Sequence, residues 1–273
     1  MNIEVVVASM NQIDFSLISK MNLKTDAVIA NQGSTVAFLT QSFNFNNSCK
    51  LITTNTRGVG LNRNIGLCFA KGDVLVFSDE DVVFYDDYDK SITEAFESFP
   101  NADVIMFGID FVKNNIMYKR RLPKKGKLSF FKSLKFGACS IAIKRSSLLK
   151  SHLSFSELFG GGCIYSHGED SDFIIQCYKR KLKIYAYNKV ICKTSKDSST
   201  CFEGYDEKYF FDTGAFAKHS FGPLLRFFYI NYIAFRIKET NLHFRKKKAL
   251  LKTGCKAFDS LISYKSFVQN YDK

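Results

Sequence analysis

The sequence lacks any long uninterrupted apolar run. Its longest apolar stretch, residues 221–235, is broken by Arg226 and Asn231 and falls short of the roughly 20 residues that a membrane-spanning helix needs. The chain opens on Met1-Asn2-Ile3-Glu4, with neither a basic segment nor a small-residue cleavage site, which argues against a secretory signal peptide. We therefore expect a protein without a spanning helix that stays in the cytoplasm.

Paired cysteines are also missing. Eight cysteines are present, but no two form a Cys-x-x-Cys pair, and most have apolar neighbours. Structural zinc sites usually need such pairs, so the sequence favours small buried thiols over a zinc centre. The eight are Cys49, Cys68, Cys139, Cys163, Cys177, Cys192, Cys201 and Cys255.

Acidic residues are scarce in two segments, which leaves the net charge of +13 unevenly spread. Residues 119–135 hold eight Lys or Arg and no acid, and residues 226–256 hold nine against the single acid Glu239. Nucleic acid, anionic lipid and phosphate-bearing substrates are candidate partners for such surfaces. A solvated basic face without a partner is the alternative interpretation for each run.

Short apolar runs alternate with helical patterns over the first 110 residues. Residues 3–8 form an apolar run interrupted only by Glu4, with three valines in a row, as expected of a buried parallel strand. Apolar residues recur between Leu61 and Phe69 at the spacing of one helix face. This alternation predicts an α/β fold with a doubly wound, mostly parallel sheet flanked by helices. Further strands are expected at residues 27–30, 51–54, 73–78, 104–109 and 138–143, and further helices at 13–20, 88–99 and 171–180.

Three acids, from Asp79 to Asp81, follow the strand expected at residues 73–78, which has an apolar centre. Ligands of an open α/β sheet bind at the carboxyl ends of its strands. In extended chain Asp79 and Asp81 point to the same side, where two carboxylates can hold Mg²⁺ or Mn²⁺ together with substrate phosphates. An ordinary acidic turn is the alternative.

Glycines and arginines surround the start of the helix expected from Leu61. Gly58 and Gly60 precede it, and Arg57 and Arg63 flank its first turn. Positive charge there opposes the helix dipole, so an anion or a carboxylate is expected nearby. The spacing is neither a P-loop nor a dinucleotide fingerprint, and an ordinary glycine-containing loop is the alternative.

Acids gather again where a later helix is expected to begin, at Glu169, Asp170 and Asp172. They can be simple caps that complement the helix dipole. The functional interpretation is a general base held on a rigid element near a substrate hydroxyl. His167 and His219 are further candidate ligands, with a hydrogen-bonded structural histidine as the alternative.

In this order and spacing, these motifs resemble those of family 2 glycosyltransferases with the GT-A fold, of the kind that bacteria use to build surface polysaccharides. The resemblance covers residues 3–110 well and residues 137–220 more loosely. The matching residues are Ala8-Ser9-Met10-Asn11 for the end of the first strand, Gly58 or Gly60 with Arg63-Asn64-Ile65-Gly66 for the helix, Ala70-Lys71-Gly72-Asp73 for a turn, Asp79-Glu80-Asp81 for the Asp-x-Asp metal motif and Glu169-Asp170 for the acceptor-side pair.

The resemblance implies inverting transfer of a hexose from a nucleotide-diphosphate donor. A divalent cation, Mn²⁺ or Mg²⁺, held by Asp79 and Asp81 would neutralise the leaving diphosphate. Asp170 would remove the proton from the acceptor hydroxyl, with Glu169 positioning the acceptor and Asp172 as the alternative base. The nucleotide-binding residues that the resemblance implies are Ser9, Asn11, Asn31, Arg63 and Asp79.

One position departs from the family pattern. The second strand of these enzymes often ends in Asp-Asp-Gly-Ser, where an Asp contacts the base, but here it ends in Asn31-Gln32-Gly33-Ser34. An amide can still pair with a base edge, because it offers a donor and an acceptor. Nucleotide binding therefore remains expected, with uridine as the commonest base of the family.

The resemblance also implies a division of the chain. We expect a GT-A catalytic domain over residues 1–200, with a nucleotide-sugar half over 1–110 and an acceptor half over 111–200. A helical, basic C-terminal extension is expected over 201–273. The implied acceptor is a glycan, free or linked to polyprenyl diphosphate, in the synthesis of a bacterial polysaccharide such as a capsule or O-antigen.

The C-terminal region combines an apolar, aromatic stretch at 221–235 with a basic cluster that includes residues 245–248. This combination is typical of an interfacial membrane segment and predicts peripheral binding at the inner face of the cell membrane. The alternative is that the aromatic residues close the core and the lysines are merely solvated.

Two other functions are considered. A sugar nucleotidyltransferase shares the sheet and the paired acids, but it would show a glycine-rich basic segment after the first strand, which Ser9-Met10-Asn11-Gln12 lacks. A non-catalytic α/β protein could use the basic runs to bind nucleic acid. The transferase interpretation expects no nucleic-acid partner.

Overall fold

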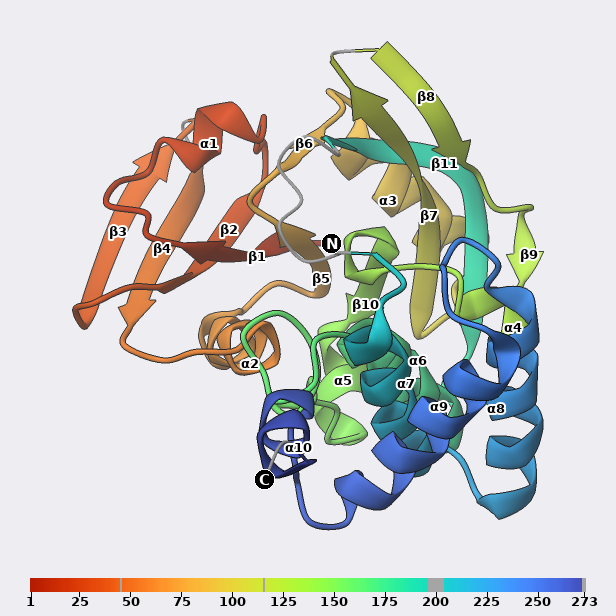
Figure 1. Cartoon of the computed structure of the whole chain (residues 1–273). Coiled ribbons are helices and arrows are strands. Elements are labelled where there is room, and N and C mark those ends of the chain that lie inside the picture. Colours follow the sequence, from red (N-terminus) through yellow and green to blue (C-terminus); the bar gives the residue numbers. More distant parts are fainter. Residues whose placement is uncertain (45, 115, 196–203, 272–273) are drawn as a thin grey trace. The chain divides into compact units, whose positions relative to one another are not determined.

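Figure 1 shows the computed structural model of the chain, which describes residues 1–44, 46–114, 116–195 and 204–271. Its residues group into two compact units. The sheet unit comprises residues 1–57, 61–155 and 173–199, and the helical unit comprises residues 58–60, 156–172 and 200–273. The sequence predicts a functional division at residue 200. The two units are defined by packing and do not test that division, so it stays a prediction.

The sheet unit is built from strands and helices in alternation. Its strands are β1 (Ile3–Met10), β2 (Asp26–Gln32), β3 (Ala37–Phe43), β4 (Asn47–Thr54), β5 (Val74–Asp79), β6 (Val82–Phe84), β7 (Val104–Lys113), β8 (Ile116–Arg121), β9 (Gly126–Lys127), β10 (Ile141–Lys144) and β11 (Ile184–Ser195). The helices before residue 180 are α1 (Leu17–Lys20), α2 (Val59–Phe69), α3 (Tyr88–Ser98), α4 (Phe130–Ser133), the 3₁₀ helix η1 (Ala138–Ser140), α5 (Arg145–Lys150) and α6 (Glu169–Lys179).

The strands form one mixed sheet in the order β3-β4-β2-β1-β5-β10-β7-β11-β6, with β8 beside β7 and β9 beside β11. Strands β4, β2, β1 and β5 are parallel neighbours. Strand β10 is antiparallel to both β5 and β7, so β7 runs in the same direction as β5, and β11 is parallel to β7. The predicted α/β class, a large mostly parallel sheet flanked by helices, is confirmed.

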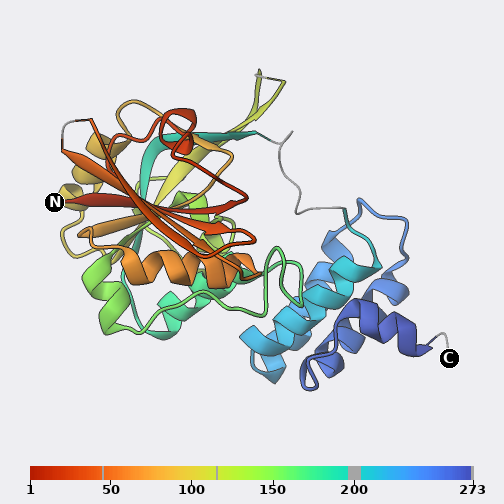
Figure 2. The ribbon, with the colours of Figure 1, turned by 90° about the vertical axis from the view of Figure 1, so that its left-hand side faces the viewer.

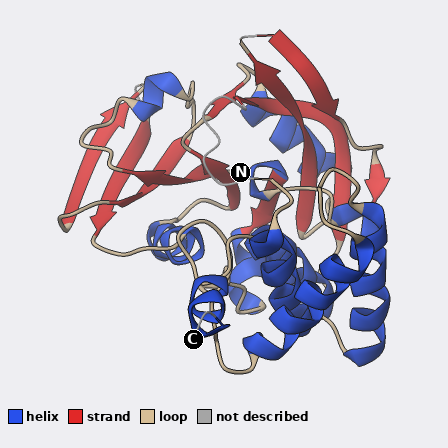
Figure 3. Cartoon of the chain, in the orientation of Figure 1, coloured by secondary structure: helices blue, strands red, loops and turns tan. Residues whose placement is uncertain are grey.

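Helices cover both faces of this sheet (Figure 3). On β1, Val5 and Val7 face one apolar layer that includes residues of α1 and α3, while Val6 faces a second layer that includes residues of α5 and α6. Alternate side chains of a strand point to opposite faces, so a strand buried on both sides must be apolar throughout. This is why residues 5–8 are an uninterrupted apolar run, and why Glu4, the one charged residue among residues 3–8, needs partners.

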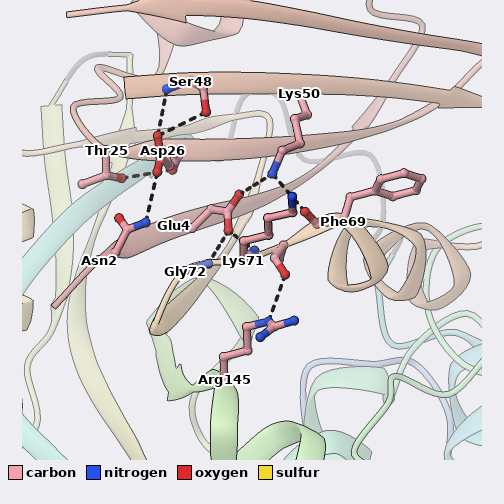
Figure 4. A network of polar contacts seen from close by, with 11 residues as sticks. Asn2, Glu4, Thr25, Asp26, Ser48, Lys50, Phe69, Lys71, Gly72 and Arg145 are labelled. Carbon is pink, nitrogen blue, oxygen red and sulfur yellow. Dashed lines mark hydrogen bonds and ion pairs between the residues drawn. The ribbon is translucent and has the colours of Figure 1, made fainter. Parts of the chain in front are cut away.

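The turn before β5 is held by a buried carboxylate (Figure 4). Glu4 is 2% exposed, and it accepts hydrogen bonds from the backbone N–H groups of Lys71 and Gly72, the latter at 2.6 Å. Lys50 Nζ lies 3.3 Å from the same carboxylate. A Cβ on Gly72 would lie 2.6 Å from the Cβ of Glu4, so this position needs glycine. The Ala-x-Gly-Asp turn therefore has a structural function. It lies at the amino end of β1.

Two predicted elements differ from the structure. The helix expected at 13–20 is a single turn, Leu17–Lys20, and the strand expected at 138–143 begins with the 3₁₀ turn of η1. The edge strand β3 (Ala37–Phe43) was not predicted, because its side chains are mostly exposed and form no apolar run. The other expected strands and helices are present, with ends shifted by up to four residues.

The cysteines in the described residues are free thiols. Cys49, Cys177 and Cys192 are buried, as the sequence predicts, but Cys68 is exposed. Cys139, Cys163 and Cys255 are half-buried, and Cys201 lies outside the described residues.

The helical unit contains α7 (Glu207–Ser220), α8 (Pro223–Arg236), α9 (Phe244–Phe258) and α10 (Tyr264–Tyr271), as the sequence predicts for the region beyond residue 198. Helices α7 and α9 pack closely through two glycines. A Cβ on Gly254 would lie 1.9 Å from the carbonyl oxygen of Phe211, and one on Gly214 would lie 2.0 Å from that of Leu251. Among the described helices, none is long and apolar enough to cross a membrane.

We predict that Gly254→Ala destabilises the chain, although alanine is normally the better helix former. The added methyl group would collide with the backbone of α7, so the two helices must separate, at a cost of about 2 kcal/mol or more. Thermal unfolding of the purified protein measures this. Gly222→Ala is the matched control, because its Cβ would meet nothing within 4 Å. Equal melting temperatures for the two variants would contradict the prediction.

Candidate functional site

The predicted donor-binding residues lie at one edge of the sheet, where the parallel strands end. In the strand register Ser9 is opposite Asn31, Asn31 is opposite Thr53, and Ala8 is opposite Asp79. Residues far apart in the sequence are therefore brought side by side at the carboxyl ends of β1, β2, β4 and β5. This is the edge at which open α/β sheets bind their ligands.

Asn31 is the hub of this edge. Its side chain is fully buried, and its Nδ2 donates to the carbonyl oxygen of Gln12 at 2.8 Å and to the hydroxyl of Thr53 at 3.0 Å. Its Oδ1 accepts from the backbone N–H of Gln12 at 2.9 Å and from the Ser9 hydroxyl at 3.4 Å. Both ends of the amide thus fix the loop after β1. A contact of Asn31 with a nucleotide base stays a prediction.

The loop after β1 turns at Asn11, which has φ 58° and whose N–H donates to the carbonyl oxygen of Gln32 at 2.8 Å. Asparagine tolerates this left-handed conformation better than most residues. The predicted contact of this exposed residue with a nucleotide is untested by the geometry.

Asn62 also belongs to this edge, although its role was not predicted from the sequence. It is fully buried on α2 and donates to the carbonyl oxygens of Ala30 at 2.8 Å and Ser9 at 3.2 Å. These bonds hold α2 against the ends of β1 and β2. A polar residue on the apolar face of a helix was the available signal. Gly66 lets the same helix approach, because a Cβ there would lie 2.7 Å from Val6.

Arg63 forms an ion pair with the first acid of the Asp-x-Asp motif. Its Nη2 lies 2.7 Å from Asp79 Oδ1, and its guanidinium is 5.1 Å from the ring centroid of Phe155. The Arg63 side chain is 2% exposed, whereas that of Asp79 is 43% exposed. The expected carboxylate near Arg63 is thus Asp79, which also accepts a contact from Cys139 Sγ at 3.4 Å.

The other two acids of the motif have different neighbours. Asp81 Oδ2 accepts from the Thr194 hydroxyl on β11 at 3.2 Å. Glu80 Oε2 accepts from Gln12 Nε2 at 2.6 Å and from the backbone N–H of Met10 at 3.4 Å, so it braces the loop after β1. That structural role for Glu80 was not predicted.

Asp79 and Asp81 carry carboxylate oxygens, the type of ligand that a hard divalent ion prefers. Mg²⁺ is commonly bound by one or two carboxylates together with substrate phosphates, so two acids can be enough. Within the described part of the chain, no group of three or more His, Cys, Asp or Glu side chains could hold a metal by itself. The residues therefore fit an ion that shares its ligands with a substrate.

In the helical unit, the first turn of α6 carries Glu169, Asp170 and Asp172. Asp172 is buried, and its Oδ1 lies 3.0 Å from His219 Nε2. Glu169 and Asp170 are half-exposed. Gly160, at φ 107°, makes room for the Glu169 carboxylate, because a Cβ there would lie 2.8 Å from its Cδ.

The loop before α6 is fixed by a second buried acid. Asp212 on α7 accepts from the Ser166 hydroxyl at 2.6 Å and from its N–H at 2.9 Å. His167 Nε2 lies 2.9 Å from the Thr213 hydroxyl, and its ring stacks on Tyr209 at 4.5 Å. Burial lowers the pKa of His167 to about 4, so the ring is neutral near pH 7. Both candidate histidine ligands, His167 and His219, thus have hydrogen-bonding partners within the protein.

A surface pocket of about 530 Å³ lies elsewhere in the sheet unit, between residues near β6, β8 and β11. Buried Asp110 positions its rim, because it accepts two hydrogen bonds from Arg120, at 2.7 and 2.8 Å, and one from the Tyr85 hydroxyl at 2.8 Å. Hydrogen bonds from Arg120 lower the pKa of Asp110. The pKa of Tyr85 is raised to about 12, mainly by burial and then by the nearby Asp110 carboxylate. The lining residues are Tyr85, Asp86, Asp87, Arg120, Leu122, Asn188, Lys189 and Val190.

Comparison with known proteins identifies one family. The sequence profile described as Glycosyl transferase family 2 matches residues 13–153. Among solved structures, S. aureus TarS 1-349 is similar, at 14% identity and TM-score 0.55 over 95% of this chain and 72% of that one. The same protein in complex with UDP-GlcNAc matches at 15% identity and TM-score 0.56, over 95% and 73%. Such low identity shows the fold alone. No curated protein matches the chain.

We predict that His167 makes stability fall as the pH is lowered from about 6.5 to about 4. Its pKa is lower in the folded chain than in the unfolded one, so the unfolded chain binds the extra proton, and the stabilisation present above pH 6.5 is lost toward pH 4. His167→Gln should flatten this part of the profile, measured by thermal unfolding against pH. His152→Asn, at an exposed histidine, is the control. A profile unchanged by His167→Gln would contradict the assignment.

Proposed function

The chain belongs to glycosyl transferase family 2 and is a glycosyltransferase, and from this premise we propose that it moves a hexose, with inversion, from a nucleotide-diphosphate donor to a glycan hydroxyl. The observation that carries the proposal is the gathering of Ser9, Asn31, Arg63 and Asp79 at one sheet edge. The binding of UDP-GlcNAc by a protein of similar fold supports a uridine-linked donor.

We infer that Asp79 and Asp81 form the diphosphate end of the donor site. Asp79 already balances the charge of Arg63, and the exposed part of its side chain faces solvent. Asp81 is oriented by Thr194. Together they would hold Mn²⁺ or Mg²⁺, which when bound would supply positive charge to the leaving diphosphate. Ser9, Asn11 and Asn31 would shape the nucleotide end of the same site.

Asp170 is the proposed general base. In the transfer, the acceptor oxygen forms a bond to the anomeric carbon while the bond from that carbon to the diphosphate oxygen breaks, and the acceptor proton passes to the base. The half-exposed carboxylate of Asp170 can meet a substrate, whereas Asp172 is buried against His219. This difference supports Asp170 as the base, with Glu169 positioning the acceptor.

The acceptor that we propose is a glycan, free or carried on polyprenyl diphosphate, in bacterial polysaccharide synthesis. A lipid carrier would require the enzyme to work at the inner face of the membrane. Helix α8 supports this, because it exposes a large apolar surface, while on the helix itself only Ile230 and Ala234 are buried. The exposed residues are Leu224 at 73%, Leu225 at 39%, Phe227 at 58%, Phe228 at 60%, Tyr232 at 56% and Phe235 at 72%.

This exposure disfavours the alternative in which the aromatic residues close the core. It agrees with an interfacial helix whose apolar face enters the lipid boundary beside basic residues. One basic residue must be removed from that surface, however. Lys247 is only 6% exposed, and its Nζ donates to the carbonyl oxygen of Ile237 at 2.6 Å. Lys246 lies 3.2 Å from Glu207, so Arg236, Lys238 and Arg245 are better candidates for lipid contact.

The central test is hydrolysis of nucleotide sugars with Mn²⁺ or Mg²⁺ over a panel of donors. We predict that Asp81→Asn nearly abolishes donor turnover, because one metal-binding carboxylate is lost, and that Asp79→Ala chiefly weakens donor binding. Asp86→Asn, at a side chain that is 83% exposed, is the control and should remain active. Full activity of the native enzyme in excess EDTA would disprove the metal requirement.

A second prediction concerns the base. Asp170→Asn should leave calorimetric donor binding intact and lower transfer by a factor on the order of 10²–10⁴, the usual contribution of a positioned base. Asp172→Asn should mainly lower stability, because it weakens the contact with His219. If Asp172→Asn instead caused the larger loss of transfer in a folded protein, Asp172 would be the base. Loss of donor binding in Asp170→Asn would move that residue to the donor site.

The third prediction concerns α8. Replacing both Phe228 and Phe235 by Gln should weaken binding to anionic vesicles about tenfold or more, because each ring loses its burial in the lipid boundary. Hydrolysis of the soluble donor should be unchanged. Leu149→Gln, which also removes an exposed apolar side chain, is the control in sedimentation with vesicles. Equal loss of donor hydrolysis would indicate that α8 belongs to the fold instead.

A further inference from the structure

A β-hairpin projects from the sheet unit at its donor-binding edge. Strand β7 and its partner β8 extend beyond β5 and β10 in both views (Figures 1 and 2), and β11 runs beside β7 as far as Val112. Val76 on β5 is aligned through β10 with Ile105 on β7. From that level β5 continues three residues to Asp79, whereas β7 continues eight residues to Lys113. The hairpin therefore reaches roughly 16 Å past the level of Asp79 in the same direction, at about 3.3 Å per residue.

The outer strand of this hairpin exposes apolar side chains. Ile116 is 70% exposed, Met117 is 51% exposed and Tyr118 is 50% exposed. Among the described strands, β8 pairs only with β7. Three consecutive exposed apolar side chains on an open edge strand invite association, and natural proteins usually avoid them unless a partner covers them.

The charge around this apolar tip is positive. Lys113 and Lys119 flank it and are exposed. Between residues 104 and 135 the sequence contains one acid, Asp110, which is buried and paired with Arg120. No exposed carboxylate therefore competes for the two lysines within this segment. Apolar side chains beside exposed lysines suit a surface that is apolar inside and negatively charged outside.

We propose that the tip of the β7–β8 hairpin, formed by Ile116, Met117 and Tyr118 with Lys113 and Lys119, docks on an anionic lipid bilayer. Because the hairpin points the same way as the carboxyl ends of β1 and β5, docking turns the donor-binding edge toward the lipid. If the proposed transferase function holds, that edge then faces an acceptor displayed at the membrane surface. Nucleic acid is the other polyanion that basic residues could bind, but it offers no apolar layer for these three side chains.

The chain contains no tryptophan, so one introduced tryptophan reports on its own position. Tyr118→Trp places the probe at the tip, and Phe38→Trp places it on the distant edge strand β3, at a side chain of similar exposure, 54%. Each protein is mixed with phosphatidylcholine vesicles containing about 30% phosphatidylglycerol and lipid brominated in the acyl chains. We expect a blue shift and strong quenching for the probe at 118 and neither for the probe at 38.

Binding strength gives a second, independent readout. Replacing Ile116 and Met117 by Ser should weaken sedimentation with the same vesicles about tenfold, and Lys113→Gln with Lys119→Gln should remove most of its dependence on salt. Val36→Ser and Lys150→Gln, at other exposed positions of the sheet unit, are the matched controls. Melting temperatures and donor hydrolysis should stay at the native level in all of these variants, because none of these residues lies in the donor site.

Several outcomes would overturn the docking proposal. Vesicle-bound protein without quenching at position 118 would assign the membrane contact to another element, such as α8. Native-level vesicle binding by the Ile116 and Met117 variant would do the same, and a response of the probe at 118 to duplex DNA but not to vesicles would favour a nucleic-acid surface. Absence of donor hydrolysis in the native protein would instead contradict the transferase function and leave the vesicle results to be judged separately.

Discussion

The sheet edge formed by the carboxyl ends of β1, β2 and β5 depends on the buried guanidinium of Arg63. This group keeps its charge at any physiological pH, and at 2% exposure it has little contact with water, so it requires a nearby anion. Asp79 is that anion, which fixes the end of β5 to helix α2. Asn62, one residue earlier on α2, donates to the carbonyl oxygens of Ser9 and Ala30, near the ends of β1 and β2. Two neighbouring residues thus connect three parallel strands to one helix. The positions of the side chains at the ends of those strands are therefore fixed.

The sequence predicted the parts of this arrangement that depend on local pattern. Apolar runs identified β1 and β5, helical spacing identified α2, and the arginine expected near the start of that helix correctly indicated a nearby carboxylate. The bracing roles of Glu4 and Glu80 were not predictable, because each depends on which strands become neighbours, whereas Asn62 could have been noticed as a polar residue on the apolar face of a helix. Strand order is decided by long-range pairing, and no periodicity in the sequence records that β1 lies between β2 and β5. Edge strand β3 escaped prediction for a related reason, since an exposed strand has no apolar signature.

The acidic turn of α6 illustrates how structure separates residues that look equivalent in sequence. Asp170 and Asp172 are two positions apart on a helix, about 200° around its axis, so they cannot point in the same direction. Asp172 is buried, within hydrogen-bonding distance of His219, while Asp170 remains half-exposed. A buried carboxylate with a fixed partner is suited to hold the helix in place, and an accessible one is suited to meet a substrate. Under the proposed function, Asp172 would hold the helix that positions Asp170 as the base.

The net charge of +13 does not form one basic face, because several of the cations have partners within the protein. Arg120 is balanced by buried Asp110, Arg121 packs against the rings of Phe111 and Phe136, and Lys247 is buried with its ammonium on a backbone carbonyl. These cations already interact with groups of the protein. The net charge calculated from composition is therefore larger than the charge available to a partner. Some of the exposed cations lie beside exposed apolar side chains, as Lys113 and Lys119 do on the hairpin tip and Arg236 does on α8. This proximity of cations and apolar side chains favours lipid over nucleic acid as a partner. A phosphate backbone interacts mainly with the cations, whereas a bilayer can also bury the apolar side chains next to them.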